Sequence, residues 1–344
     1  MSLPIGQPVP WFTAPTPSNP EFVFDSAAGR YVLMLFLPLE AEDKAMALKA
    51  LAEHQARFDD VQLSAFVVFR DAAMGTGLKD LRGLRWLYDR GAITERYGPE
   101  PHWLLLDPTL RVLATAPIER AEGFFAQVAA LPPPAGHAGV ALHAPVLIAP
   151  RIFEPELCQA LIDLHQAHGG TRTGVMRDEG PRTVAVMDEL KQRRDILVEP
   201  PELQAAIRAR LERRLFPLIK QALGFTVTET ERLLVSCYDA REGGVFHPHR
   251  DNTTQSTAHR RFACSLNLND DFEGGDLRFA EYGLATYRPP KGGAVVFSCG
   301  LMHEAMRITT GRRYAFLPFF YDASGAATLA AYNARIAGLE GAAS

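Results

Sequence analysis

Residues 243–252 read GGVFHPHRDN, and this stretch indicates the architecture of the second half of the chain. A Gly-Gly turn leads into a short run typical of a β-strand, and the run ends in the triplet that joins His249 and Asp251. Further short runs of this kind alternate with Gly-rich turns, which predicts an antiparallel jelly roll or barrel. The predicted strands are Leu233–Tyr238, Val245–His249, Arg261–Leu268, Leu277–Ala280, Ala294–Phe297 and Arg313–Tyr321.

The segments upstream of these strands predict a second domain and a linker. Apolar residues recur at helical spacing in Pro155–Ala167 and Pro201–Leu223, so we expect helices flanking the sheet. Residues 131–139 read LPPPAGHAG, which neither a helix nor a strand can continue. We therefore expect domains at residues 1–131 and 145–325, a linker at 132–144 and a C-terminal helix or tail at 326–344, as suits 344 residues.

The first domain is predicted to be an α/β layer fold with a central sheet, because strand-like and helix-like runs alternate along it. The expected strands are Tyr31–Leu37, Val61–Phe69, Trp103–Asp107 and Val112–Thr115, and the expected helices are Ala41–Phe58, Leu78–Tyr88 and Ala121–Leu131.

Composition excludes several classes of protein. A hydrophobic content of 47% argues against a disordered chain. A net charge of −4 gives no sign of a basic surface that would bind nucleic acid or an anionic membrane. The start, MSLPIGQPVPWF, lacks a basic and then apolar leader, and the apolar runs are too short to span a bilayer. Four scattered cysteines suit reduced thiols, so we expect a cytoplasmic protein without membrane or nucleic-acid partners.

The histidines and acids of the second domain predict a metal site. Residues two apart on a strand share a face, so His249 and Asp251 can bind one metal, and His303 can supply a third ligand from a later strand end. Two imidazoles and one carboxylate leave coordination positions open, as in non-haem Fe(II) sites. His247 lies two residues before His249, so a set of His247, His249 and His303 is the competing assignment.

The second domain resembles the Fe(II)- and 2-oxoglutarate-dependent dioxygenases, in particular their prolyl 4-hydroxylase-like branch. The resemblance runs from residue 145 to 322 and implies a double-stranded β-helix with flanking helices. The matching runs are Tyr238, GGVFHPHRDN at 243–252, LNLNDDFEGGDLRF at 266–279, PKGGAVVF at 290–297, HE at 303–304 and GRRYA at 311–315.

The resemblance also implies roles for single residues. His249, Asp251 and His303 are expected to bind Fe(II), and Arg313 to pair with the distal carboxylate of 2-oxoglutarate, a geometry that arginine suits. Tyr238 and Asn267 are expected beside the cosubstrate. Arg312 is the alternative to Arg313, but alternation along the strand sends Arg312 to the opposite face.

The first domain resembles the thioredoxin-like fold, and within it the peroxiredoxins. The matching runs are GQPVPWF at 6–12, the strand that ends at Pro38, YG at 97–98 and WLLLDP at 103–108. Peroxiredoxins carry their reactive cysteine just after that strand, but residues 38–44 read PLEAEDK, and Cys158 is the first cysteine of the chain. Thiol peroxidase chemistry needs a sulfur, so we expect a scaffold, a docking module or a dimerisation module instead.

Together these resemblances imply an oxidoreductase that uses Fe(II), 2-oxoglutarate and O₂, with ascorbate as a candidate reductant. The expected reaction is hydroxylation of a peptide, with prolyl residues as a candidate, or of a small molecule, with release of succinate and CO₂. Asp251 favours hydroxylation, because related halogenases lack this carboxylate. The alternative is a non-catalytic binding or regulatory protein built from two degenerate enzyme domains.

Overall fold

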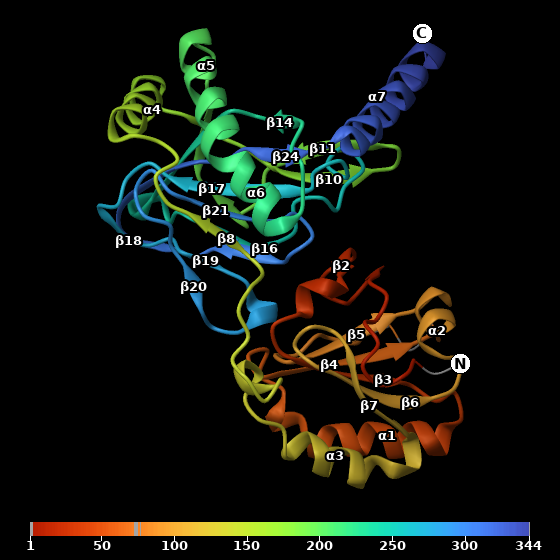
Figure 1. Ribbon diagram of the computed structural model, residues 1–344. Coiled ribbons are helices and arrows are strands. Elements are labelled where there is room, and N and C mark those ends of the chain that lie inside the picture. Colours follow the sequence, from red (N-terminus) through yellow and green to blue (C-terminus); the bar gives the residue numbers. More distant parts are fainter. Residues whose placement is uncertain (1–2, 72–74, 76, 344) are drawn as a thin grey trace. The chain divides into compact units, whose positions relative to one another are not determined.

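The computed structural model describes residues 3–71, 75 and 77–343 (Figure 1). The chain forms two compact units. Unit 1 consists of Met1–Ala144 and Phe279–Ala285, and unit 2 consists of Pro145–Arg278 and Thr286–Ser344. No helix in the described part of the chain combines the length and the apolar character needed to cross a bilayer.

Unit 1 is built on a five-stranded sheet in the order β5-β4-β3-β6-β7. Strands β3, β4 and β5 are parallel, whereas β6 and β7 form an antiparallel hairpin beside β3. Two of the helices, α1 and α3, lie side by side against one face of this sheet (Figure 1). The bounds are β3 (Tyr31–Phe36), α1 (Ala41–Glu53), β4 (Leu63–Phe69), β5 (Leu84–Tyr88), α2 (Ala92–Tyr97), β6 (His102–Leu106), β7 (Val112–Pro117) and α3 (Ala121–Ala129), with a small pair β1 (Thr13–Ala14) and β2 (Phe22–Val23).

The prediction of a helix over Leu78–Tyr88 is wrong. Its leucines have helical spacing, but residues 84–88 form β5, which pairs in parallel with β4. Gly83 has a φ of +75°, which ends any helical path just before this strand. Backbone pairing with an existing buried strand therefore overrides the local periodicity.

Unit 2 is rich in β-structure, and most of its strands belong to a major and a minor sheet. The major sheet runs β14-β24-β17-β23-β15-β13-β9, with β21 and β8 continuing from β17, and the minor sheet runs β12-β16-β22-β19-β20. The strands are β8 (Leu147–Ala149), β9 (Thr171–Arg172), β12 (Lys191–Gln192), β13 (Arg194–Leu197), β14 (Glu229–Glu231), β15 (Leu234–Asp239), β16 (Val245–His249), β17 (Phe262–Asn267), β18 (Phe272–Gly274), β19 (Leu277–Arg278), β20 (Thr286–Tyr287), β21 (Ala294–Ser298), β22 (His303–Ala305), β23 (Ile308–Phe316) and β24 (Phe319–Tyr321), with a separate hairpin of β10 (Val175–Glu179) and β11 (Arg182–Val186).

Helices cover one face of the major sheet and bury its apolar side chains. The helices are α4 (Pro155–His168), α5 (Pro201–Arg210), a π-helical turn at Leu211–Leu215 and α6 (Phe216–Leu223), and α7 (Ala323–Ala343) ends the chain. Leu161 and Ile207 from the helices pack with Val235, Leu266 and Phe316 from the strands, all of them fully buried. Burial of this apolar face accounts for the stability of the layer.

The opposite face of the major sheet is polar, because side chains alternate along each strand. Tyr238 on β15 lies opposite Arg313 on β23 in the antiparallel register, and both point away from the helices. Ser265 and Asn267 on β17 have the same orientation and are buried. A polar face of this kind must be hydrogen-bonded internally or by a ligand.

The turn at Gly292 has no room for a side chain. Gly292 has a φ of +71°, and a Cβ there would lie 2.2 Å from the carbonyl oxygen of Phe153. The main-chain nitrogens of Ile152 and Phe153 both donate to the carbonyl oxygen of Gly292, at 2.8 and 2.9 Å. The turn before β21 is therefore packed directly against the segment before α4.

Candidate metal centre

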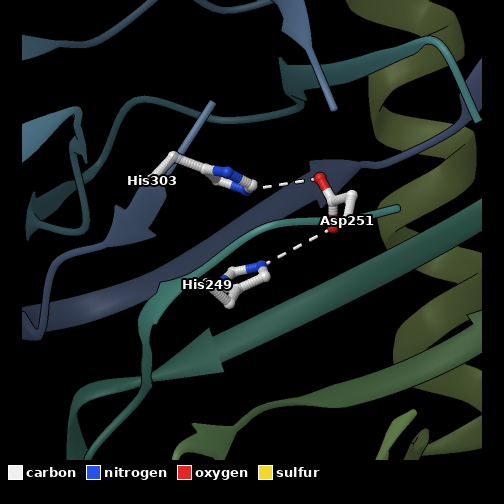
Figure 2. A group of neighbouring side chains, drawn as sticks. All are labelled: His249, Asp251 and His303. Atoms are coloured by element: carbon white, nitrogen blue, oxygen red, sulfur yellow. Dashed lines mark ion pairs between the residues drawn. The ribbon is translucent and has the colours of Figure 1, made fainter. Parts of the chain in front are cut away.

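Three side chains from two neighbouring strands converge in the minor sheet (Figure 2). His249 is the last residue of β16 and His303 the first of β22, and the two are direct partners in the antiparallel register. Asp251 follows in the bend after β16. Its Oδ1 lies 3.6 Å from His249 Nε2 and its Oδ2 3.4 Å from His303 Nε2. One ligand atom from each residue lies within 4.8 Å of the others.

A β-bulge and a stacked ring set the position of His249. The register shifts between Phe246 and His249, which brings His249 opposite His303. The ring of Phe246 stacks on that of His249, with centroids 3.5 Å apart. The main-chain nitrogen of Asp251 donates to the carbonyl oxygen of Cys299 at 3.0 Å, which holds the bend that carries the carboxylate.

Main-chain carbonyls orient both imidazoles. His249 Nδ1 lies 2.7 Å from the carbonyl oxygen of His247, and His303 Nδ1 lies 3.0 Å from that of Leu301. A carbonyl oxygen only accepts, so each Nδ1 carries the proton and each Nε2 presents a lone pair. Both lone pairs are on the side of Asp251, as metal coordination requires.

The charges around the cluster favour the protonation states that a metal needs. Burial, together with the neighbouring His249, lowers the pKa of His303 to about 4, so His303 is neutral near pH 7. Burial alone would raise the pKa of Asp251, but His303 and His249 outweigh it and hold that pKa well below its usual range. An ionised carboxylate beside the neutral imidazole of His303 binds a cation without first losing a proton.

This donor set fits Fe(II). Two imidazole nitrogens and one carboxylate oxygen on one side of a metal leave the remaining positions open for other ligands. Within the described ranges, this is the one group of three or more His, Cys, Asp and Glu side chains arranged to hold a metal. His247 is outside the group, and its carbonyl oxygen serves His249 instead.

Arg313 is held in place on the polar face of the major sheet. The side chain is only 2% exposed. Its Nε donates to Asn267 Oδ1 at 2.9 Å, and its Nη2 donates to Ser265 Oγ at 2.6 Å. Asn267 in turn donates to the carbonyl oxygen of Pro289 at 2.9 Å. Nη1 has no partner among the described residues, so the guanidinium is immobilised with one end unused.

Tyr238 lies between Arg313 and an arginine that the sequence did not single out. The guanidinium carbon of Arg313 is 5.5 Å from the centre of the Tyr238 ring, and that of Arg193 is 5.7 Å from it. Arg193 Nη1 donates to the Tyr238 hydroxyl at 2.9 Å. Arg193 and Asp195 alternate with the exposed Arg194, and such alternation is typical of a strand. Had β13 been predicted, this pattern could have indicated that Arg193 and Asp195 face inward.

Arg312 and His259 are each held by a carboxylate. Arg312 points to the opposite face from Arg313, as alternation predicts, and its Nε donates to Asp239 Oδ2 at 2.6 Å. His259 is 2% exposed, and its Nε2 lies 2.8 Å from Glu231 Oε2. Residues 252–259 are tied down rather than loose, since the main-chain nitrogen of Gln255 donates to Asp178 at 3.1 Å.

Comparison with known proteins agrees with this donor set. Residues 233–321 match the model of the 2OG-Fe(II) oxygenase superfamily, and they include all six predicted site residues. These residues are therefore a 2OG-Fe(II) oxygenase domain, whose family implies Fe(II), 2-oxoglutarate and O₂. No curated protein matches the chain.

Several solved structures are similar to parts of the chain. A prolyl-4-hydroxylase from Pseudomonas putida is 19% identical and covers 52% of this chain and 92% of its own, with a TM-score of 0.40. A prolyl hydroxylase from Trichoplax adhaerens, in complex with a hypoxia-inducible factor peptide fragment, is 16% identical and covers 53% and 86%, with a TM-score of 0.44. A viral collagen prolyl hydroxylase from Paramecium bursaria Chlorella virus-1 is 14% identical and covers 51% and 94%, with a TM-score of 0.39.

Proposed function

We propose that this 2-oxoglutarate-dependent dioxygenase hydroxylates an unactivated C–H bond, and that His249, Asp251 and His303 hold its Fe(II). The observation that carries the assignment is the cross-strand pairing of the two histidines beside one ionised carboxylate. Bound together, Fe(II), 2-oxoglutarate and O₂ supply the oxidising chemistry, and 2-oxoglutarate ends as succinate and CO₂.

The side chains around the metal site have separable roles in this proposal. Arg313 pairs with the distal carboxylate of 2-oxoglutarate through its unused Nη1, and Tyr238 borders the same ligand. Asn267 and Ser265 keep the guanidinium of Arg313 aimed, because each accepts one of its hydrogen bonds. An arginine held in this way loses little entropy when it binds a carboxylate.

We further propose that unit 2 is a double-stranded β-helix and that unit 1 has a thioredoxin-like fold without catalytic activity. The two sheets of unit 2, of which the minor one carries His249 and His303, support the first assignment. The mixed sheet of unit 1, with its terminal antiparallel hairpin, supports the second. Position 41, where α1 begins, is an alanine preceded by Glu40, so the expected place for a reactive thiol holds none. Unit 1 then serves to dock a protein partner or a second copy.

The substrate is proposed to be a peptide, with peptidyl proline as the first candidate and a small molecule as the second. Succinate release with a panel of proline-containing peptides, compared with free amino acids, distinguishes the two. Binding of iron and 2-oxoglutarate without turnover of any substrate would favour a regulatory binding protein instead.

Substitution of His249 tests the metal assignment. We expect His249→Ala to abolish tight Mn(II) binding and to remove succinate production, because a ligand and its lone pair are lost. His247→Ala is the matched control, since it changes a histidine on the same strand that lies outside the cluster. Mn(II) affinity is read by titration and succinate by a coupled assay. Full turnover in His249→Ala, or loss of Mn(II) in His247→Ala alone, would overturn the ligand set.

A further inference from the structure

Arg193 is a buried cation at the point where the chain passes from the minor to the major sheet. It lies between β12 and β13 and is 7% exposed. Its guanidinium carbon is 5.4 Å from the centre of the Phe246 ring on β16 and 5.7 Å from that of Tyr238 on β15. Arg193 therefore joins the strand that carries His249 to the polar face that carries Arg313.

A carboxylate network holds the Arg193 guanidinium still. Its Nε lies 3.0 Å from Oδ1 of Asp195, a residue that is 4% exposed. Ser236 Oγ donates to the same oxygen at 2.6 Å, and Lys191 Nζ lies 3.4 Å from Oδ2. Thr173 completes the set by donating to Asp195. With its carboxylate partner fully engaged, Arg193 has little freedom to move its remaining nitrogens.

This arrangement determines how Tyr238 can bond. A phenol has one proton to donate, and its oxygen accepts. Arg193 Nη1 occupies the acceptor side at 2.9 Å, so the hydroxyl proton must point elsewhere. No acceptor among the described residues takes that proton, and Nη1 of Arg313 beside the same ring is likewise unused. The Tyr238 hydroxyl and Arg313 Nη1 are thus two hydrogen-bond donors beside the same ring. They suit a ligand that only accepts hydrogen bonds, and a carboxylate is such a ligand.

We propose that Arg193 is a positioning residue that commits the Tyr238 hydroxyl to donate a hydrogen bond to a carboxylate of 2-oxoglutarate. The proposal rests on the function proposed above. Arg193 acts through Tyr238, because its Nε pairs with Asp195 and its Nη1 donates to the phenol oxygen. Without Arg193 the hydroxyl can turn its proton away, and the carboxylate loses a preorganised donor.

Binding of 2-oxoglutarate in the presence of Mn(II), measured by calorimetric titration of the full chain, tests this role. We expect Tyr238→Phe to weaken 2-oxoglutarate binding about tenfold, since one hydrogen bond to a charged group is lost. Arg193→Gln should weaken it to a similar extent. The double variant should be no weaker than the weaker single variant, because residues that act through one another are not additive.

Matched variants separate this role from folding. Arg194→Gln is the control, because Arg194 is the adjacent arginine, is half-exposed, and pairs with Glu242 instead; its affinity should stay within about twofold. Arg193→Lys keeps a cation beside Asp195. Compared with Arg193→Gln, it should restore part of the affinity when Tyr238 is present, but none when Tyr238 is replaced by phenylalanine. This pair of variants carries the test if Arg193→Gln does not fold. Mn(II) affinity should be unchanged throughout.

The possible outcomes are distinct. Losses that add in the double variant, or an Arg193→Gln protein that binds 2-oxoglutarate as tightly as the wild type, would overturn the role of Arg193 alone. A wild-type protein that binds Mn(II) but not 2-oxoglutarate would instead overturn the proposed function itself.

Discussion

Lys191 is a buried amine inside unit 2, and its environment makes stability depend on pH. Burial and the nearby Arg193 lower the pKa of Lys191 to about 7, because Asp195 compensates only in part. In the unfolded chain the pKa returns to its ordinary value of 10.5. Between pH 7 and that value the unfolded state holds a proton that the folded state lacks. The free energy of unfolding therefore rises with pH across this window.

Replacing Lys191 should flatten that dependence. We expect the free energy of unfolding of the wild type, minus that of Lys191→Met, to increase between pH 7 and 10 by up to roughly 1 kcal/mol per pH unit. Below pH 7 the amine is charged in both states, so the difference should be constant. Urea unfolding at several pH values measures it, with Lys220→Met on the exposed side of α6 as control. Parallel curves for the wild type and Lys191→Met would show that the buried amine does not titrate.

Most of the proposed site residues could be named from the sequence. Residue types and spacing already indicate His249, Asp251 and His303 as ligands, and the resemblance to the dioxygenases implies the role of Arg313. Arg193 could not be found in this way, because its importance depends on a hydrogen bond to Tyr238, which is 45 positions away. The burial of His259 could not be found in this way either, since Glu231 is brought to it by the fold.

At the scale of the element, the turn after β18 makes room for Arg313. Gly275 has a φ of +71°, and a Cβ there would lie 2.1 Å from Ile308 Cδ1 and 3.1 Å from Arg313 Cδ. A side chain at this position must therefore strain the backbone and displace both neighbours. The glycine is required by this close approach as well as by its backbone angle.

We expect Gly275→Ala to lower the free energy of unfolding by about 2 kcal/mol and to weaken 2-oxoglutarate binding. The first effect arises from the strained backbone and the second from movement of the arginine. Denaturant unfolding and calorimetric titration measure the two effects. Gly123→Ala is the control, because Gly123 lies in α3 with open space around it and ordinary helical φ. A Gly275→Ala protein with unaltered affinity would mean that Arg313 is not displaced.

The elements themselves were predicted with mixed success. The flanking helices and the strands around the metal site follow from periodicity, since a buried face imposes its own repeat. The predicted strand Arg313–Tyr321 is in fact the end of β23 followed by β24, interrupted at Leu317 and Pro318. The strands β9 to β13 were not predicted, because their segments are short and charged, and β9 and β13 acquire partners only in the assembled sheet.

At the scale of the whole molecule, the site residues all belong to unit 2. His249, Asp251, His303 and Arg313 lie there, together with all four cysteines, which are buried. A ligand that binds only the folded form of one unit stabilises that unit by mass action. Ligand binding should therefore affect the two units differently.

We expect calorimetry of the full chain to resolve two transitions, and Mn(II) with 2-oxoglutarate to raise only one of them. At a hundredfold excess over Kd the stabilisation is about 2.7 kcal/mol, or roughly 5–10 °C in Tm for a unit of this size. His249→Ala should abolish the shift and so identify the transition of unit 2. A single transition that moves as a whole, or two that move together, would contradict independent unfolding.

The sequence by itself determined the proposed ligands, their order and the lack of a thiol before Cys158, because these depend on residue identity and local period, and the family resemblance added the proposed role of Arg313. Only the tertiary structure decided that a bulge sets His249 opposite His303, that residues 84–88 join a sheet, and that Arg193 holds Tyr238. Each of these depends on contacts between segments far apart in the chain. Such contacts are selected by the packing of the whole unit and leave no periodic trace in either segment.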